Sequence, residues 1–156
     1  MKKPIFTCLL YFLALASCTD TPIKDELYSI NYETKAERVN VLKGEITAKS
    51  DFENAEFLLY SSNGFTFNPS SLFTPDYKDY KYVVKVSPED IDKWTTGLTK
   101  VTPSVDFEVW PHNLIRIRKE EWQLQSKPEY YTMKEESVYV LVYRKEGILF
   151  KKAITF

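Results

Sequence analysis

The sequence predicts a mostly β domain with antiparallel strands, and three observations favour it. Apolar and polar residues alternate with a period of two in several segments, as they do in half-buried strands. Other short runs are apolar at every position, and polar turns separate these segments. Roughly seven to nine short strands of this kind favour a β-sandwich of immunoglobulin-like or transthyretin-like type, with an α+β arrangement as the alternative.

The alternating pattern is clearest at the start of the expected domain. Tyr28, Ile30 and Tyr32 alternate with polar neighbours, and Val39 and Val41 do the same a few residues later. A period of two places such residues on one face of a strand. We therefore expect half-buried strands in this part of the chain.

Three later runs, at 57–60, 82–84 and 138–143, are apolar on both sets of positions. Because both faces of such a strand avoid water, we expect central strands that are covered on both sides. The last run is followed by a charged turn with Gly147, which can take a positive φ, and then by apolar residues up to Phe156. The end of the chain is therefore predicted to form a β-hairpin.

One helix start stands out between the expected strands. Ser87 is a favourable N-cap, Pro88 suits the first helical position, and two acids follow them. Ile91 and Trp94 are three residues apart, so they share one face, and Gly97 is a natural stop. We expect one short helix here, with Trp94 packed on the edge of the sheet.

Two more strands are expected on either side of a short turn, at 107–109 and 114–118. Ile115 and Ile117 alternate with arginines, which again fits the period of a strand. The turn between them, at 110–113, reads Trp-Pro-His-Asn.

The first residues have the order of an export signal. Two lysines precede an apolar stretch over 5–16, which is too short to cross a bilayer as a helix, since that takes about 20 residues. The stretch runs into Leu-Ala-Ser-Cys at 15–18. This motif resembles the lipobox of bacterial lipoproteins, and the resemblance implies cleavage before Cys18 and lipid attachment to its thiol.

The resemblance divides the chain into a signal peptide at 1–17, a lipidated tether at 18–25 and a single β domain at 26–156. Ordinary secretion is the alternative, because Ala-Leu-Ala at 14–16 also fits a signal-peptidase site. Cys18 would then be the one cysteine left in the mature chain, without a partner for a disulfide. Two or more acyl chains, at about 0.8 kcal/mol per buried CH₂, give stable attachment, so we expect a membrane-anchored protein.

The residues after Cys18 bear on where such a protein is sorted. In enterobacterial lipoproteins an Asp directly after the cysteine favours the inner membrane, whereas this chain has Thr19 there and Asp20 one place later. The resemblance therefore implies the outer membrane in preference to the inner one. The segment Lys-Asp-Glu at 24–26 is similar to the acidic surface-export signal of Bacteroidetes lipoproteins, so the periplasmic side and the cell surface both stay open.

Charge and motifs exclude several classes of function. Without Lys2 and Lys3, the 21 basic and 22 acidic residues become 19 and 22, a formal charge of −3, which argues against a nucleic-acid partner. Four glycines leave no Gly-rich phosphate loop, and no nucleophile-elbow or zinc-protease motif occurs. His112 is the sole histidine and lacks a partner for a metal site. We therefore expect a protein that is not an enzyme and that binds neither a cofactor nor a metal.

Aromatic residues make up 15% of the chain, and most of them are expected in the core. Tyr and Trp among charged residues are typical of protein-recognition surfaces and also of sugar-stacking ones. The candidate binding residues in such contexts, with the histidine of the Trp-Pro-His-Asn turn, are Trp110, His112, Tyr77, Tyr80, Trp122, Tyr130 and Tyr131. Trp110 has two interpretations: it docks a partner, or it caps the core.

We therefore expect a non-catalytic module of the cell envelope that binds a partner protein, as an adaptor, an inhibitor or immunity-like protein, or an assembly component. A glycan-binding accessory lipoprotein is the alternative.

Overall fold

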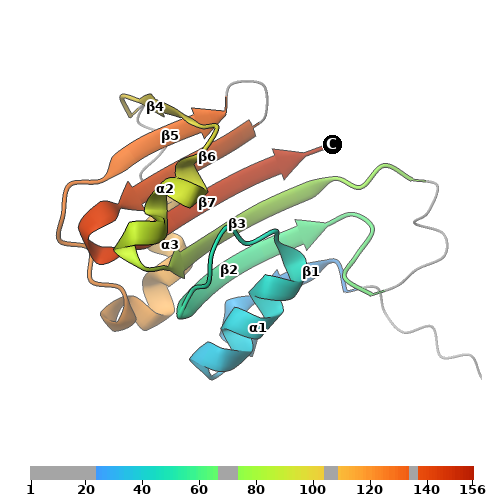
Figure 1. Cartoon of the computed structure of the whole chain (residues 1–156). Helices are drawn as coiled ribbons and strands as arrows, with labels where there is room; N and C mark the ends of the chain where they lie inside the picture. The colour runs from blue at the N-terminus through green and yellow to red at the C-terminus, as the bar shows by residue number, and fades with distance from the viewer. Residues whose placement is uncertain (1–23, 67–73, 104–108, 134–136) are drawn as a thin grey trace, which may run out of the picture.

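The computed structural model describes residues 24–66, 74–103, 109–133 and 137–156. These residues form one antiparallel sheet of seven strands, with short helices on both of its faces (Figure 1). The mostly β class is thereby confirmed. The sandwich is not, because every described strand belongs to the same sheet. No helix within the described ranges is both long and apolar enough to cross a membrane.

The strands lie in the order β1-β2-β3-β7-β6-β5-β4 across the sheet. Pairing of β3 with β7 along their whole length joins the two halves of the sheet, and the short strands β1 and β4 form its edges. Short edge strands offer little template for pairing with another chain. The bounds are β1 Glu26–Tyr28, β2 Asn54–Ser61, β3 Lys78–Lys85, β4 Thr99–Val101, β5 Glu129–Met133, β6 Ser137–Tyr143 and β7 Ile148–Thr155.

Three α-helices lie in the described residues, where the sequence predicted one. Figure 1 shows α1 and α2 in front of the sheet and α3 behind it. Four short 3₁₀ helices within the same described ranges connect the elements. The bounds are α1 Lys35–Glu45, α2 Ile91–Thr95, α3 Val109–Ile115, η1 Ser29–Asn31, η3 Pro88–Asp90, η5 Arg116–Glu121 and η6 Arg144–Glu146.

The strand expected around Val39 and Val41 is wrong, because this segment is the helix α1. A capping box starts the helix: the Thr34 hydroxyl accepts a hydrogen bond from the Glu37 backbone N–H, and the Glu37 carboxylate accepts one from the Thr34 N–H. A pattern of only two valines, two positions apart, is too short to outweigh this signal for the start of a helix. Of the strand expected over Tyr28 to Tyr32, only Tyr28 lies in a strand, because η1 begins at Ser29.

The strands expected at 107–109 and 114–118 are also wrong where the structure describes them, since α3 and η5 occupy the segment from Val109 to Glu121. Residues 107 and 108 lie outside the described ranges. Pro111 is compatible with the helix because it lies in the first turn, where its missing N–H has no intrahelical partner.

Several other elements follow the sequence. The apolar runs lie in β2, β3 and β6, and the terminal hairpin pairs β6 with β7 through a turn in which Gly147 has a φ of +67°. The short helix α2 follows Pro88, buries Ile91 and Trp94, and ends just before Gly97.

Each face of the sheet carries its own hydrophobic core. On one face, Leu42 of α1 and Trp94 of α2 pack on the side chains of β2, β3, β6 and β7. On the other face, Ile115 of α3 and Trp122 pack on a second cluster that includes Phe150 of β7. Helices thus supply the cover that a second sheet would give in a sandwich.

Candidate functional site

A hollow of about 450 Å³, named here the α3 groove, lies between η1 and α3 on the face that carries the second core. Ile30 lines it from η1, Leu58 and Lys81 line it from β2 and β3, and Trp110 and Leu114 line it from α3. The groove therefore joins residues that are up to 89 positions apart in the chain, from Tyr28 to Ile117.

The side chains around the α3 groove are unusually apolar for a surface. Tyr28 is 38% exposed, Ile30 is 52% exposed and Ile117 is 56% exposed, and all three line the groove. Arg116 adds positive charge to the same lining, whereas the ammonium group of Lys81 is paired with Asp79 at 2.6 Å. A contiguous apolar patch with polar residues at its border is typical of a surface that binds another molecule.

Trp110 contributes both to the core and to the groove. Its ring meets Phe150 edge to face, with 6.2 Å between centroids and 81° between planes. The side chain is half-buried, and its remaining surface lines the groove. Trp110 thus combines features of both interpretations that the sequence left open.

The other sequence-predicted residues do not gather at the α3 groove. His112 is exposed on α3, and Tyr77 stacks between Tyr60 and Phe156 at the opposite end of the sheet. Trp122 is only 3% exposed and belongs to the second core. Little of its side chain is left for a partner.

Tyr130 and Tyr131 neighbour each other in β5 but lie on opposite faces. Tyr130 packs against the second core, and Tyr131 is buried in the first. The Tyr131 hydroxyl donates to the Glu129 carboxylate at 2.6 Å. That bond, with the cations of Arg144 and Lys100, lowers the pKa of Glu129 to about 2.

A buried polar cluster, missed from the sequence, supports one side of the α3 groove. Strand β1 pairs with β2 only at 58–60, so β1 does not cover the outer edge of β2 over 54–57. Arg38 of α1 is fully buried at this open edge, and its Nε donates to the Ala55 carbonyl oxygen at 2.9 Å. The Arg38 Nη2 also donates to Glu121 of η5, so one side chain ties α1 to both β2 and η5.

Glu56 is the second centre of this cluster. Its carboxylate is almost fully buried and accepts two bonds from Nη1 of Arg118, at 3.0 and 3.1 Å, and one from the Ser29 hydroxyl. Arg118 also donates to the Tyr32 carbonyl oxygen. These bonds fix η1 and η5 to β2. A carboxylate directly before the apolar run of β2 was the signal for this cluster in the sequence, but its partners come from segments that are distant along the chain.

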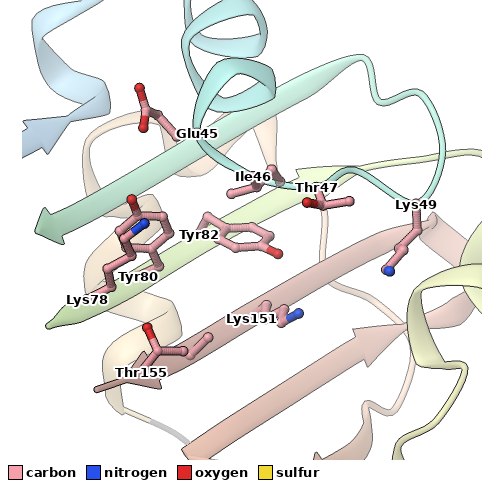
Figure 2. A pocket seen from close by; sticks show the side chains of 10 residues that line it. Glu45, Ile46, Thr47, Lys49, Lys78, Tyr80, Tyr82, Lys151 and Thr155 are labelled. Carbon is pink, nitrogen blue, oxygen red and sulfur yellow. The ribbon is translucent and has the colours of Figure 1, made fainter. Parts of the chain in front are cut away.

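A second hollow of about 390 Å³, named here the α1–β7 pocket, lies on the other face of the sheet (Figure 2). Strand β3 contributes two tyrosines and a lysine, β7 contributes a lysine and a threonine, and the end of α1 with its following loop forms the rest. The lining residues are Glu45, Ile46, Thr47, Lys49, Lys78, Tyr80, Tyr82, Lys151, Ala153 and Thr155. The predicted binding residue Tyr80 therefore belongs to this pocket and not to the α3 groove.

Over the described ranges, no three side chains of His, Cys, Asp or Glu lie close enough together to hold a metal ion.

Comparison with known proteins gives no relative. No family model, no curated protein and no solved structure matches the chain.

Proposed function

We propose that this protein is a lipid-anchored lipoprotein of the bacterial cell envelope and that its β domain binds a partner protein through the α3 groove. The observation that carries the binding proposal is the group of exposed apolar side chains, Tyr28, Ile30 and Ile117, around the half-buried Trp110. Tryptophan, tyrosine and arginine are the residues most enriched at the energetic centres of protein interfaces.

Rigidity of the groove supports the same proposal. The walls of the groove come from η1 on one side and from α3 with η5 on the other, and the ion pair of Glu56 with Arg118 joins η1 and η5 to β2. A surface that is already ordered loses less conformational entropy when a partner docks. A rigid apolar surface with Arg116 at its border suits a protein partner that presents apolar side chains beside an acidic residue.

The anchor is proposed from the lipobox-like motif that ends at Cys18. The described residues begin at Lys24, whose carbonyl oxygen accepts a bond from Phe65 N, and the Asp25 carbonyl oxygen accepts one from Ser61 N. Lys24 is six positions after Cys18, a separation of at most about 20 Å in an extended chain. The domain would therefore lie close to the membrane surface, and Thr19 after the cysteine favours the outer membrane.

Substitution of the cysteine tests the anchor. The Cys18→Ser protein is expected to lose labelling with radioactive palmitate and to leave the membrane fraction, because no other cysteine remains after cleavage. Labelling and fractionation of wild type and variant from the same cells give the comparison. A Cys18→Ser protein that still takes up palmitate and sediments with membranes would contradict the anchor.

Site-specific photo-crosslinking in intact cells tests the partner. A photoreactive residue at Ile30 or at Ile117 is expected to give one discrete crosslinked protein, because both side chains line the groove and are exposed. The same probe at Phe156, an exposed apolar residue at the far end of the sheet, is the control. Equal crosslinking from all three positions would contradict a partner site at the α3 groove.

A further inference from the structure

Three aromatic side chains, named here the aromatic cluster, gather at one end of the sheet. Tyr77 lies between the other two, and its ring centroid is 5.9 Å from that of Tyr60 and 5.3 Å from that of Phe156. Tyr60 and Tyr77 are half-buried, whereas Phe156 is 91% exposed. The cluster therefore presents an apolar ring to the surroundings, with two phenols beside it.

The described chain enters the sheet beside this cluster. Glu26, the first residue of β1, is paired with Tyr60 of β2. One residue earlier, the Asp25 carbonyl oxygen accepts a hydrogen bond from the Ser61 N–H. In Figure 1 the label C marks the end of β7 on this side of the sheet, where β2 also ends. The segment that leads back to the anchor thus joins the domain at the aromatic cluster.

The lipid anchor would hold this end of the domain close to the membrane. Lys24 lies at most about 20 Å from Cys18, whereas β7, with eight residues, extends about 26 Å towards the other end of the sheet. A short tether gives the cluster an effective concentration of about millimolar at the membrane. A contact that is weak by itself is therefore sufficient to orient the domain.

The side chains of the cluster suit the headgroup region of a bilayer. Tyrosine is enriched at membrane–water interfaces because its ring is apolar and its hydroxyl stays hydrated, and phenylalanine occurs on the apolar faces of interfacial segments. The nearby cations have acidic neighbours, since Lys78 is paired with Asp76 at 3.1 Å and Lys24 is followed by two acids. The contact would therefore depend on the aromatic rings and not on anionic lipid.

We propose that the aromatic cluster is the membrane-contacting face of the domain and that Phe156 inserts among the lipid headgroups of the membrane that holds the anchor. This inference rests on the lipid anchor of the proposed function and is independent of the α3 groove. It gives the predicted binding residue Tyr77 a role as the ring on which Phe156 packs.

Spin labels on the mature lipidated protein in phosphatidylcholine vesicles test the proposal. Cleavage removes Cys8 and lipid occupies Cys18, so the label reacts only with an introduced cysteine. Thr155→Cys places it beside Phe156, and Lys145→Cys places it on an exposed residue of η6, before the other end of β7. The ratio of collisions with membrane-soluble oxygen to collisions with a water-soluble nickel chelate is expected to be about threefold or more higher at 155 than at 145.

Removal of the exposed ring shows whether the cluster makes the contact. Phe156→Ser, combined with Thr155→Cys, is expected to lower the collision ratio at 155 to near the value at 145. The domain should stay folded, because the Phe156 side chain is almost fully exposed. Ile30→Ser, which alters an exposed apolar residue of the α3 groove, is the matched control and should leave the ratio at 155 unchanged.

Two measurements separate this proposal from the anchor, because sedimentation with the vesicles reports the anchor and the collision ratio reports the cluster. A protein that sediments but has equal ratios at 155 and 145 would overturn the membrane-contacting face and leave the anchor standing. A ratio unchanged in Phe156→Ser, or lowered as much in Ile30→Ser, would also overturn it. A protein that fails to sediment would overturn both proposals.

Discussion

At Gly147 both the backbone conformation and the surrounding atoms exclude a side chain. Its φ is +67°, and a Cβ added there would lie 2.2 Å from the Val86 carbonyl oxygen. The Val86 N–H in turn donates to the Gly147 carbonyl oxygen at 2.8 Å, so the two segments are held together. An alanine at this position combines an unfavourable backbone conformation with a steric clash.

Gly147→Ala is therefore expected to lower the free energy of unfolding by about 3 kcal/mol. Two other glycines are matched controls. Gly97 has a φ of +80° but open space around it, so Gly97→Ala is expected to cost only about 1 kcal/mol. Gly44 lies inside α1 with open space around it, and Gly44→Ala is expected to stabilise the protein by about 0.5 to 1 kcal/mol.

Urea unfolding of the three variants measures this order. A Gly147→Ala protein no less stable than Gly97→Ala would show that the hairpin turn is not packed against Val86 as described.

Individual residues also show which part of the α3 groove could be predicted from the sequence. Trp110 was a candidate from its neighbours alone, because Pro111 stiffens the segment and a rigid aromatic side chain loses little entropy when it docks, and it does line the α3 groove. Ile30 and Ile117 were assigned to strands and so were not recognised as groove residues. Their role depends on η1 and η5 lying side by side, a long-range arrangement that no local pattern encodes.

At the scale of elements, ion pairs link η6 to β5 and α2, and β4 to β5. Arg144 of η6 donates to the Glu129 carboxylate of β5 and to the Asp92 carboxylate of α2, and Lys100 of β4 lies 3.2 Å from Glu129. The Tyr131 hydroxyl and these cations stabilise the ionised form of Glu129, whose pKa falls from 4.5 to about 2. The unfolded chain lacks these contacts.

Stability is therefore expected to depend on pH through Glu129. Its contribution is fully present above pH 4.5 and is lost as the pH falls towards 2, because the unfolded chain then binds the proton more readily than the folded one. The side chain is partly exposed, so we expect a loss of about 1 kcal/mol or less. Thermal unfolding of wild type and Glu129→Gln between pH 6 and pH 2.5 measures it. Identical pH profiles for the two proteins would contradict the assignment.

Elements were predictable where the apolar pattern was long and not where it was short. The runs in β2, β3 and β6 and the Gly147 turn were identified correctly because strand and turn signals agreed there. The helix α1 was missed because Val39 and Val41 were weighed above the capping box of Thr34 and Glu37. The helix α3 was missed because Pro111 was taken as part of a turn, although proline is also favourable in the first turn of a helix.

For the whole molecule, the β class was predictable and the layer arrangement was not. The mostly β class follows from the pattern, but several individual strands do not, and the choice between a second sheet and helices as the cover depends on which distant segments bury the apolar faces. Here α1 and α2 cover one face and α3 covers the other, so a single sheet carries two cores (Figure 1). This arrangement leaves a hollow on each face, and the proposed partner site is the one beside α3.

The most direct test of the partner proposal is the affinity of the crosslinked partner for Ile117→Asp. The side chain is 56% exposed, so the change should leave the melting temperature nearly as in wild type. It places a charge inside the apolar groove and is expected to weaken binding about tenfold or more. Phe156→Asp, which alters a side chain that is 91% exposed at the other end of the sheet, should bind as wild type does. A folded Ile117→Asp protein that binds the partner with wild-type affinity would contradict the α3 groove as the binding site.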